Sequence, residues 1–360
     1  MSGEPAMAAA AVNAGVVEMA AAHVSAASAE VAERCAMLLA NLTNPQHAGQ
    51  AGVARLVDSP HLPGVLSTFE TVASEAALAL EAGGEPPACT GFLLGALTHV
   101  LSTDRGRNAF VTHATSARLL GQLCALLAPG SPHMPAAARA MRNLAFAAKA
   151  GEAGQAALVA LLSADGAHIV SRIALPLAPH DTGEKASGSL YEPDERAAFS
   201  PPLRAGIEAS EHRLASGGSG ADHVATPAVR EAGIVEGIEH VDNVQDGATR
   251  LALIEALLLL SAAPAACEAM RREGIFPVLR ESRAMLLLAE DEAHRPVIDA
   301  NETLVSIFHL SAGGTNMPVE PPQQRGKFVW EEEAEREEER RKAPLAAEPE
   351  SRAAEEEVDD

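Results

Sequence analysis

The sequence predicts an all-α protein of stacked helices, and three observations carry this prediction. Hydrophobic residues make up 47% of the 360 residues and aromatic residues only 3%, so alanine and leucine must form the core, as they do between closely packed helices. Apolar residues recur at the spacing of one helix face along most of the chain, whereas strand-like alternation is short wherever it occurs. Helical segments with similar ends also recur at related intervals, which is typical of repeat proteins.

Helical patterns follow one another closely in the first half of the chain. We expect Ser28 to cap a helix whose buried face carries Val31, Cys35, Leu38 and Leu42. Prolines and glycines mark the breaks between patterns. The expected helices cover residues 13–24, 28–43, 47–57, 61–82, 88–102, 105–113, 115–128, 136–149 and 152–163.

The stretch 246–310 holds four further helical patterns and the longest apolar run of the chain. When the ends of the long helices are aligned, the matching positions are Leu42, Leu97, Leu144, Leu260 and Ile307. The interval is 47 residues from Leu97 to Leu144 and again from Leu260 to Ile307, which fits an armadillo or HEAT unit. We interpret the 116 residues from Leu144 to Leu260 as about two units plus an irregular segment. The prediction is an armadillo/HEAT-like α-solenoid of stacked helical repeats, in which neighbouring repeats share one core.

Composition divides the chain into four parts. Between the two groups of repeats, Gly, Ser, Pro and charged residues replace the apolar pattern, and we expect Tyr191 to dock this segment back on the helices. Within the charged C-terminal part, residues 327–342 fit a single charged helix. The expected parts are N-terminal armadillo-like repeats (1–177), an irregular insertion with a flexible Gly/Ser loop near 215–228 (178–245), C-terminal repeats (246–312) and a charged, mostly disordered acidic tail (313–360).

The formal net charge of −22 argues against nucleic acid or an anionic membrane as the main partner. The four cysteines are far apart in apolar patterns and fit buried free thiols rather than a disulfide or zinc framework. The N-terminus lacks the pattern of a signal peptide, and no run of eighteen strongly apolar residues is present. We therefore expect a cytoplasmic protein, with the nucleus as a further location, and no membrane partner.

Two asparagines and two arginines are the candidate partner-binding residues. Asn41 and Asn143 occupy the same place near the end of a long helix, where they could bind the backbone of an extended peptide, cap their helix or bond within the repeat. Arg139 and Arg142, with Arg105 and Arg107 before them, form either a basic site for an acidic partner segment or a solvated face.

Other polar residues favour structure over chemistry. Arg280 and Glu281 are expected to pair with neighbours. Templates for catalysis fail: the Gly-rich run from Gly217 does not form a nucleophile elbow, and His212, Asp222 and His223 fall in the expected flexible segment, where a metal site lacks rigid support. We therefore expect no enzyme activity, no cofactor and no metal, with an enzyme built on residues 178–230 as the competing hypothesis.

The stretch 246–310 resembles the C-terminal signature of the HGH homologue family, armadillo-like proteins also called Brp-like. The resemblance extends upstream in the same order through residues 106–113, 138–146 and 173–178 and through Tyr191 with residues 193–196. From this resemblance we expect the chain to begin one repeat later than the family does and to carry an inserted loop near 215–228, and residues 284–289 are longer and less aromatic than the family's equivalent. The matching residues of the signature are Arg250, Glu255, Ala256, Leu257, Gly274, Phe276, Leu279, Arg280, Glu281, Glu290, Val297, Ala300, Glu302, Leu304 and Val305.

This resemblance implies a function. Members of the family act in the biogenesis of eukaryotic translation elongation factor two, as adaptors that hold a partly folded domain of the factor and bring in the ring-shaped cytosolic chaperonin. The expected protein is thus a non-catalytic chaperone-type adaptor. The alternative is an armadillo-type scaffold or transport protein that binds linear peptides, which would rely on Asn41 and Asn143.

Overall fold

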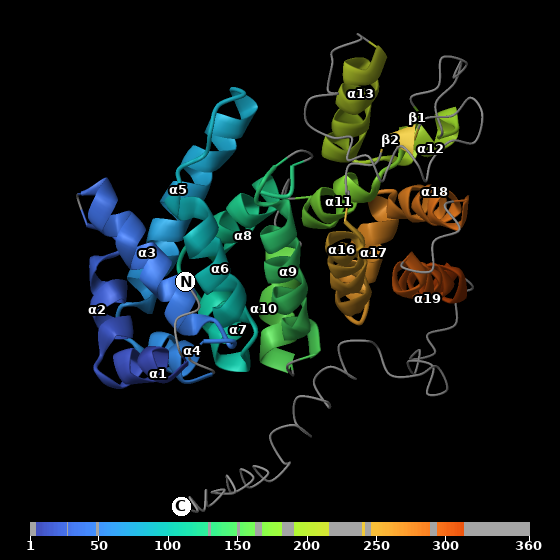
Figure 1. The fold of residues 1–360 in the computed structure, drawn as a ribbon. Coiled ribbons are helices and arrows are strands. Elements are labelled where there is room, and N and C mark those ends of the chain that lie inside the picture. Colours follow the sequence, from blue (N-terminus) through green and yellow to red (C-terminus); the bar gives the residue numbers. More distant parts are fainter. Residues whose placement is uncertain are drawn as a thin grey trace, which may run out of the picture. The chain divides into compact units, whose positions relative to one another are not determined.

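The computed structural model describes residues 5–26, 28–47, 50–128, 131–149, 152–162, 168–181, 191–215, 240–241, 246–288 and 294–312. Nearly all of them lie in helices or in the turns between helices, in agreement with the predicted all-α class and compatible with an α-solenoid (Figure 1). The strands of the described part are the antiparallel two-residue pair β1 (His180–Asp181) and β2 (His240–Val241).

Up to residue 163 the helix bounds agree with the predicted segments to within a few residues, except at the N-terminus. Helices α11, α12 and α13 were not predicted, and the last two lie in the insertion that was expected to be irregular. Up to residue 177 the helices are α1 (Pro5–Asn13), α2 (Val16–His23), α3 (Ala29–Thr43), α4 (Gln50–Asp58), α5 (Leu62–Glu81), α6 (Cys89–Leu101), α7 (Asp104–Val111), α8 (Ser116–Ala125), α9 (Met134–Ala145), η1 (Phe146–Lys149), α10 (Glu152–Leu162), α11 (Ile169–Ala174) and η2 (Leu175–Leu177). After it they are α12 (Pro193–Ala198), α13 (Pro201–Ala215), α16 (Gly247–Leu260), α17 (Pro264–Arg272), α18 (Ile275–Leu288) and α19 (Arg295–Ala312).

The described helices pack in three rows, in each of which successive members are in contact. The first-helix row is α1, α4, α7, α10 and α17, the second-helix row is α2, α5, α8, α11 and α18, and the third-helix row is α3, α6, α9, α16 and α19. The third-helix row consists of the same long helices whose ends align in the sequence, and Figure 1 shows its members running from blue α3 through green α9 to orange α16 and α19. One continuous apolar core connects the rows.

The interpretation of the 116-residue interval as about two units was wrong. Helix α9 packs directly against α16, so Leu144 and Leu260 belong to neighbouring members of the third-helix row. Helices α10 and α11 supply the first and second helices that precede α16. The interval is long because the insertion separates α11 and η2 from α16 in the sequence.

The first helix of the chain was missed. The helix predicted over 13–24 forms as α2, but α1 precedes it, with a sharp turn between the two. Gly15 makes this turn possible because it adopts φ +80°, a left-handed conformation that side chains disfavour. The alanine-rich start, Ala8 to Ala11, had no apolar contrast to mark α1 as a helix.

The buried face of α3 is rotated from the predicted one. Cys35, Leu39 and Leu42 are buried together with Ala36, but Val31 remains 43% exposed. Helix α3 also begins after Ser28 without the expected side-chain capping bond. The buried face was predicted from bulky residues alone. Alanine also contributes to it, because its small side chain permits the close contact of α3 with α6.

Two glycines mark where a first helix crosses the end of the preceding third helix. A Cβ atom on Gly52 of α4 would overlap the carbonyl oxygen of Leu42, and one on Gly106 of α7 would overlap that of Val100. Both occupy the third position of their helices, as do Gly154 in α10 and the buried Ala266 in α17. A small residue is therefore required at this position in α4 and α7, and the sequence places one there in α10 and α17 as well.

The part of the insertion that the structure describes docks on the C-terminal helices, as predicted for Tyr191. That side chain is buried and meets Phe199 edge-to-face at 5.1 Å between ring centroids. Gly274, at φ +74°, turns the chain between α17 and α18 directly against the carbonyl of Ala198. The Gly/Ser loop after residue 215 and the tail 313–360 lie outside the described residues.

Polar bonds reinforce this docking. The buried carboxylate of Glu273 accepts hydrogen bonds from the hydroxyl of Ser171, at 2.6 Å, and from its backbone N–H, at 3.2 Å. The Ser171 hydroxyl also lies 2.6 Å from that of Ser200. On the surface, Arg280 pairs with Glu195 of α12 and with Glu281, both at 2.7 Å, which confirms the expected pairing.

Candidate protein-binding surface

The three central members of the third-helix row, α6, α9 and α16, present one polar and weakly apolar surface. We call it the central surface and define it by residues that are exposed or half-buried there. They are Gly91, Gly95 and His99 of α6, Arg139 and Arg142 of α9, and Leu251 and Leu258 of α16.

Asn143 joins α9 to α6. Its side-chain amide donates a hydrogen bond to the backbone carbonyl of Thr98 at 3.0 Å. That carbonyl is one of the last four of α6, which have no partner within the helix. The bond therefore differs from the alternatives stated for Asn143, because it caps the neighbouring helix of the row and not the end of α9 itself.

Arg142 joins α9 to α16. Its guanidinium lies 3.3 Å from the carboxylate of Glu255, whose side chain is only 5% exposed, whereas that of Arg142 is 30% exposed. Removing one partner of such a pair leaves a desolvated charge and is strongly destabilising. Arg142 therefore holds two helices together and still reaches the surface. This role of Glu255 was not predicted, although a single acidic residue among the leucines and alanines of a helix indicates a buried partner.

Arg139 is exposed one helical turn before Arg142 and makes no ion pair with any residue that the structure describes. Burial, and then the positive charge of Arg139, lower the pKa of His99 on α6. The ring Nδ1 of His99 lies 3.1 Å from the hydroxyl of Thr43 at the end of α3. Polar contacts thus run across the row from α3 to α16.

Asn41 stands apart from these contacts. Its side chain is exposed near the end of α3, and its backbone carbonyl accepts a 3.3 Å hydrogen bond from the N–H of Asn44, which closes the last turn. The structure thus places Asn41 at the end of the row, where it could still meet a partner.

The broader basic site that included Arg105 and Arg107 does not form. Arg105 pairs with Asp58, and Arg107 pairs with Asp104 and donates to the Leu101 carbonyl at 2.9 Å. The guanidinium of Arg107 also lies 5.7 Å from the centre of the Phe146 ring. Both arginines belong to α7 in the first-helix row and stabilise contacts there, so only α9 contributes cations to the central surface.

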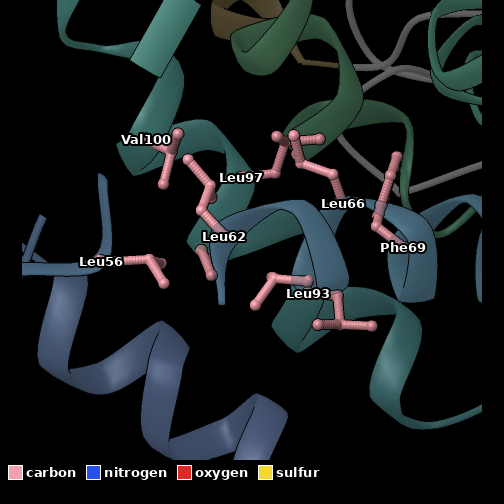
Figure 2. A pocket seen from close by; sticks show the side chains of 9 residues that line it. Leu56, Leu62, Leu66, Phe69, Leu93, Leu97 and Val100 are labelled. Atoms are coloured by element: carbon pink, nitrogen blue, oxygen red, sulfur yellow. The ribbon is translucent and has the colours of Figure 1, made fainter. Parts of the chain in front are cut away.

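A small cavity lies between α4, α5 and α6, and Figure 2 shows apolar side chains converging on it. Its volume of about 10 Å³ is near the minimum for a single water molecule, and its wall offers such a molecule no polar partners. The cavity is a packing defect of the core and not a ligand site. It is lined by Leu56, Leu62, Val65, Leu66, Phe69, Leu93, Ala96, Leu97 and Val100.

The described residues include no group of three metal-binding side chains. Cys35, Cys124 and Cys267 are buried free thiols, Cys89 is half-buried, and burial raises the pKa of Cys124 to about 12. No single described helix is long and apolar enough to span a membrane, although two helix pairs, bent by 72° and 119°, meet the criteria of length and composition.

Comparison with known proteins found no matching protein-family model and no matching curated sequence.

Proposed function

We propose that the described helices form an armadillo/HEAT-like α-solenoid of three-helix repeats. The support is the regular order of the contacts, because each first, second and third helix meets its counterpart in the next set. The small residues at the third position of the first helices repeat with the same order. A surface formed by such a row is open and extended, which suits a protein segment better than a small molecule.

We propose further that the chain is a non-catalytic chaperone-type adaptor. It binds a folding client, by resemblance translation elongation factor two, on its third-helix row and links this client to the cytosolic chaperonin. It acts in the cytoplasm and uses neither cofactor nor metal.

The observation that supports this proposal is that the upstream and C-terminal segments that resemble the family contact each other, although they are far apart in the sequence. Glu195, in the upstream match at residues 193–196, pairs with Arg280 of the C-terminal signature at 2.7 Å. Gly274 of the signature lies against Ala198, directly after the upstream match. Glu255 of the signature pairs with Arg142 in the upstream match at residues 138–146. The two segments that each resemble the family thus pack together in one structural unit.

The decisive experiment is a quantitative affinity purification of the tagged full chain from the cytosol of its native cells. Elongation factor two and the chaperonin subunits should be recovered well above an untagged control. Recovery of neither, while other proteins are enriched, would reject the adaptor function.

The alternative, a scaffold or transport protein that binds linear peptides, keeps weaker support. Its asparagine ladder requires free side-chain amides, and that of Asn143 is bonded to Thr98. Asn41 remains exposed. If alanine at Asn41 leaves the affinity for every recovered partner unchanged, this alternative loses its remaining candidate residue.

A further inference from the structure

The central surface is an acid-free region of a strongly acidic protein. The sequence contains 49 acidic and 27 basic residues, yet α6 and α9 contain no Asp or Glu. The single carboxylate within α16, that of Glu255, is buried against Arg142. The exposed charge on these three helices therefore comes from Arg139 and, in part, Arg142.

Contacts place this charge on one continuous face. Arg142 and Glu255 bridge α9 and α16, and Leu251 and Leu258 lie four residues before and three residues after Glu255, on the same side of that helix. Asn143 connects α9 with α6, where His99 is close enough for the charge of Arg139 to affect its titration. The cationic side chains of α9 thus lie beside the half-buried apolar side chains of α16.

The α6 part of this face carries two glycines and therefore has no bulky side chains there. Gly95 approaches the side chain of Ala40 on α3, and Gly91 lies near the ring of His133. An extended polypeptide can approach closely where side chains are this small, and two leucines on the α16 side offer apolar contact.

We propose that the central surface binds an acidic protein segment that carries apolar side chains, with a carboxylate of the segment on Arg139 and its apolar residues on Leu251 and Leu258. The inference rests on the proposed adaptor function and specifies the chemistry of the client. Nucleic acid is disfavoured because a net charge of −22 repels a long polyanion, whereas a short acidic segment meets only the local cations. The pair of the half-buried Arg142 and the buried Glu255 holds α9 and α16 in the geometry that presents Arg139.

The test measures the binding of two fluorescein-labelled twelve-residue peptides to the full chain. In the acidic peptide every second residue is glutamate and the residues between are leucine or serine. In the second peptide lysine replaces each glutamate. The acidic peptide should bind more tightly, and its affinity should fall as sodium chloride is raised. Arg139→Glu should weaken its binding roughly five- to tenfold, and Arg139→Gln should weaken it less. Arg105→Glu, which makes the same change of charge on the exposed face of α7, should leave the affinity within about twofold.

Equal binding of the two peptides, or unchanged binding by Arg139→Glu with an unchanged melting temperature, would overturn the assignment. The assignment would also be overturned if an oligothymidine bound as tightly as the acidic peptide and its affinity fell equally in Arg139→Glu. Binding of purified elongation factor two distinguishes a failure of the central surface from a failure of the adaptor function. If it binds wild type and Arg139→Glu equally, the surface is wrong and the adaptor function stands. If it fails to bind wild type while the acidic peptide binds as described, the surface stands and the proposed client is wrong.

Discussion

The side-chain amide of Asn143 on α9 caps the backbone carbonyl of Thr98 on α6, 3.0 Å away. The other carbonyls of the last turn of α6 are also bonded: that of His99 to Ser102, that of Val100 to Thr103 and that of Leu101 to Arg107. The end of α6 is therefore closed by its own turn, by α7 and by α9.

Asn143→Ala should lower stability by about 1 kcal/mol, because the Thr98 carbonyl loses its donor in a partly buried place. The melting temperature of the full chain measures this loss. Asn41→Ala is the matched control, since the Asn41 side chain is exposed at the equivalent position of α3. Equal effects of the two substitutions would contradict the capping role of Asn143.

Glu255→Ala should be more damaging, by about 2–4 kcal/mol, because it leaves Arg142 without its carboxylate between two helices. Chemical unfolding in urea measures the change. Glu30→Ala, which breaks the exposed pair with Arg34 one turn away on α3, should cost less than about 0.5 kcal/mol. A Glu255→Ala protein as stable as Glu30→Ala would show that the α9–α16 contact does not depend on this pair.

Gly106→Ala should destabilise the protein although alanine favours helices, because the new methyl group overlaps the Val100 carbonyl and forces α7 away from α6. Gly121 in α8 has open space around it, and Gly121→Ala should stabilise by about 0.5–1 kcal/mol. Thermal melts of the two variants should therefore move in opposite directions. A shift upward for both would mean that the first-helix row does not need its small residues.

The pKa of His99 should rise in Arg139→Ala. Burial keeps part of the depression, so the pKa should remain below its ordinary value even without the arginine. A His99 pKa that is lower in the folded than in the unfolded chain adds stability above the unfolded value, and this stability is lost as the pH falls toward the folded value. NMR titration of the ring protons measures both forms, and an unchanged pKa in Arg139→Ala would place the arginine too far away to act on His99.

The third-helix row could be predicted because leucines recur at the ends of its long helices. The 116-residue interval was misread because sequence spacing alone does not show where an insertion enters a repeat. The side-chain roles were harder to predict. From the sequence, Arg142 was expected to be a surface cation. Its partner Glu255 lies more than a hundred residues away in the sequence, so the pair could not be predicted. Val31 looked buried because the pattern was based on bulky residues, whereas α3 buries the smaller Ala36.

The insertion between α11 and α16 also has a consequence for synthesis. Helix α9 leaves the ribosome long before α16, the helix that covers it, and residues 178–246 alone take roughly 3–14 s at about 5–20 residues per second. During this delay the apolar side of α9 that faces α16 has no cover from its final neighbour. Deleting the residues from 216 to 239 should shorten this interval, and the nascent chain should then become resistant to protease sooner after α9 emerges.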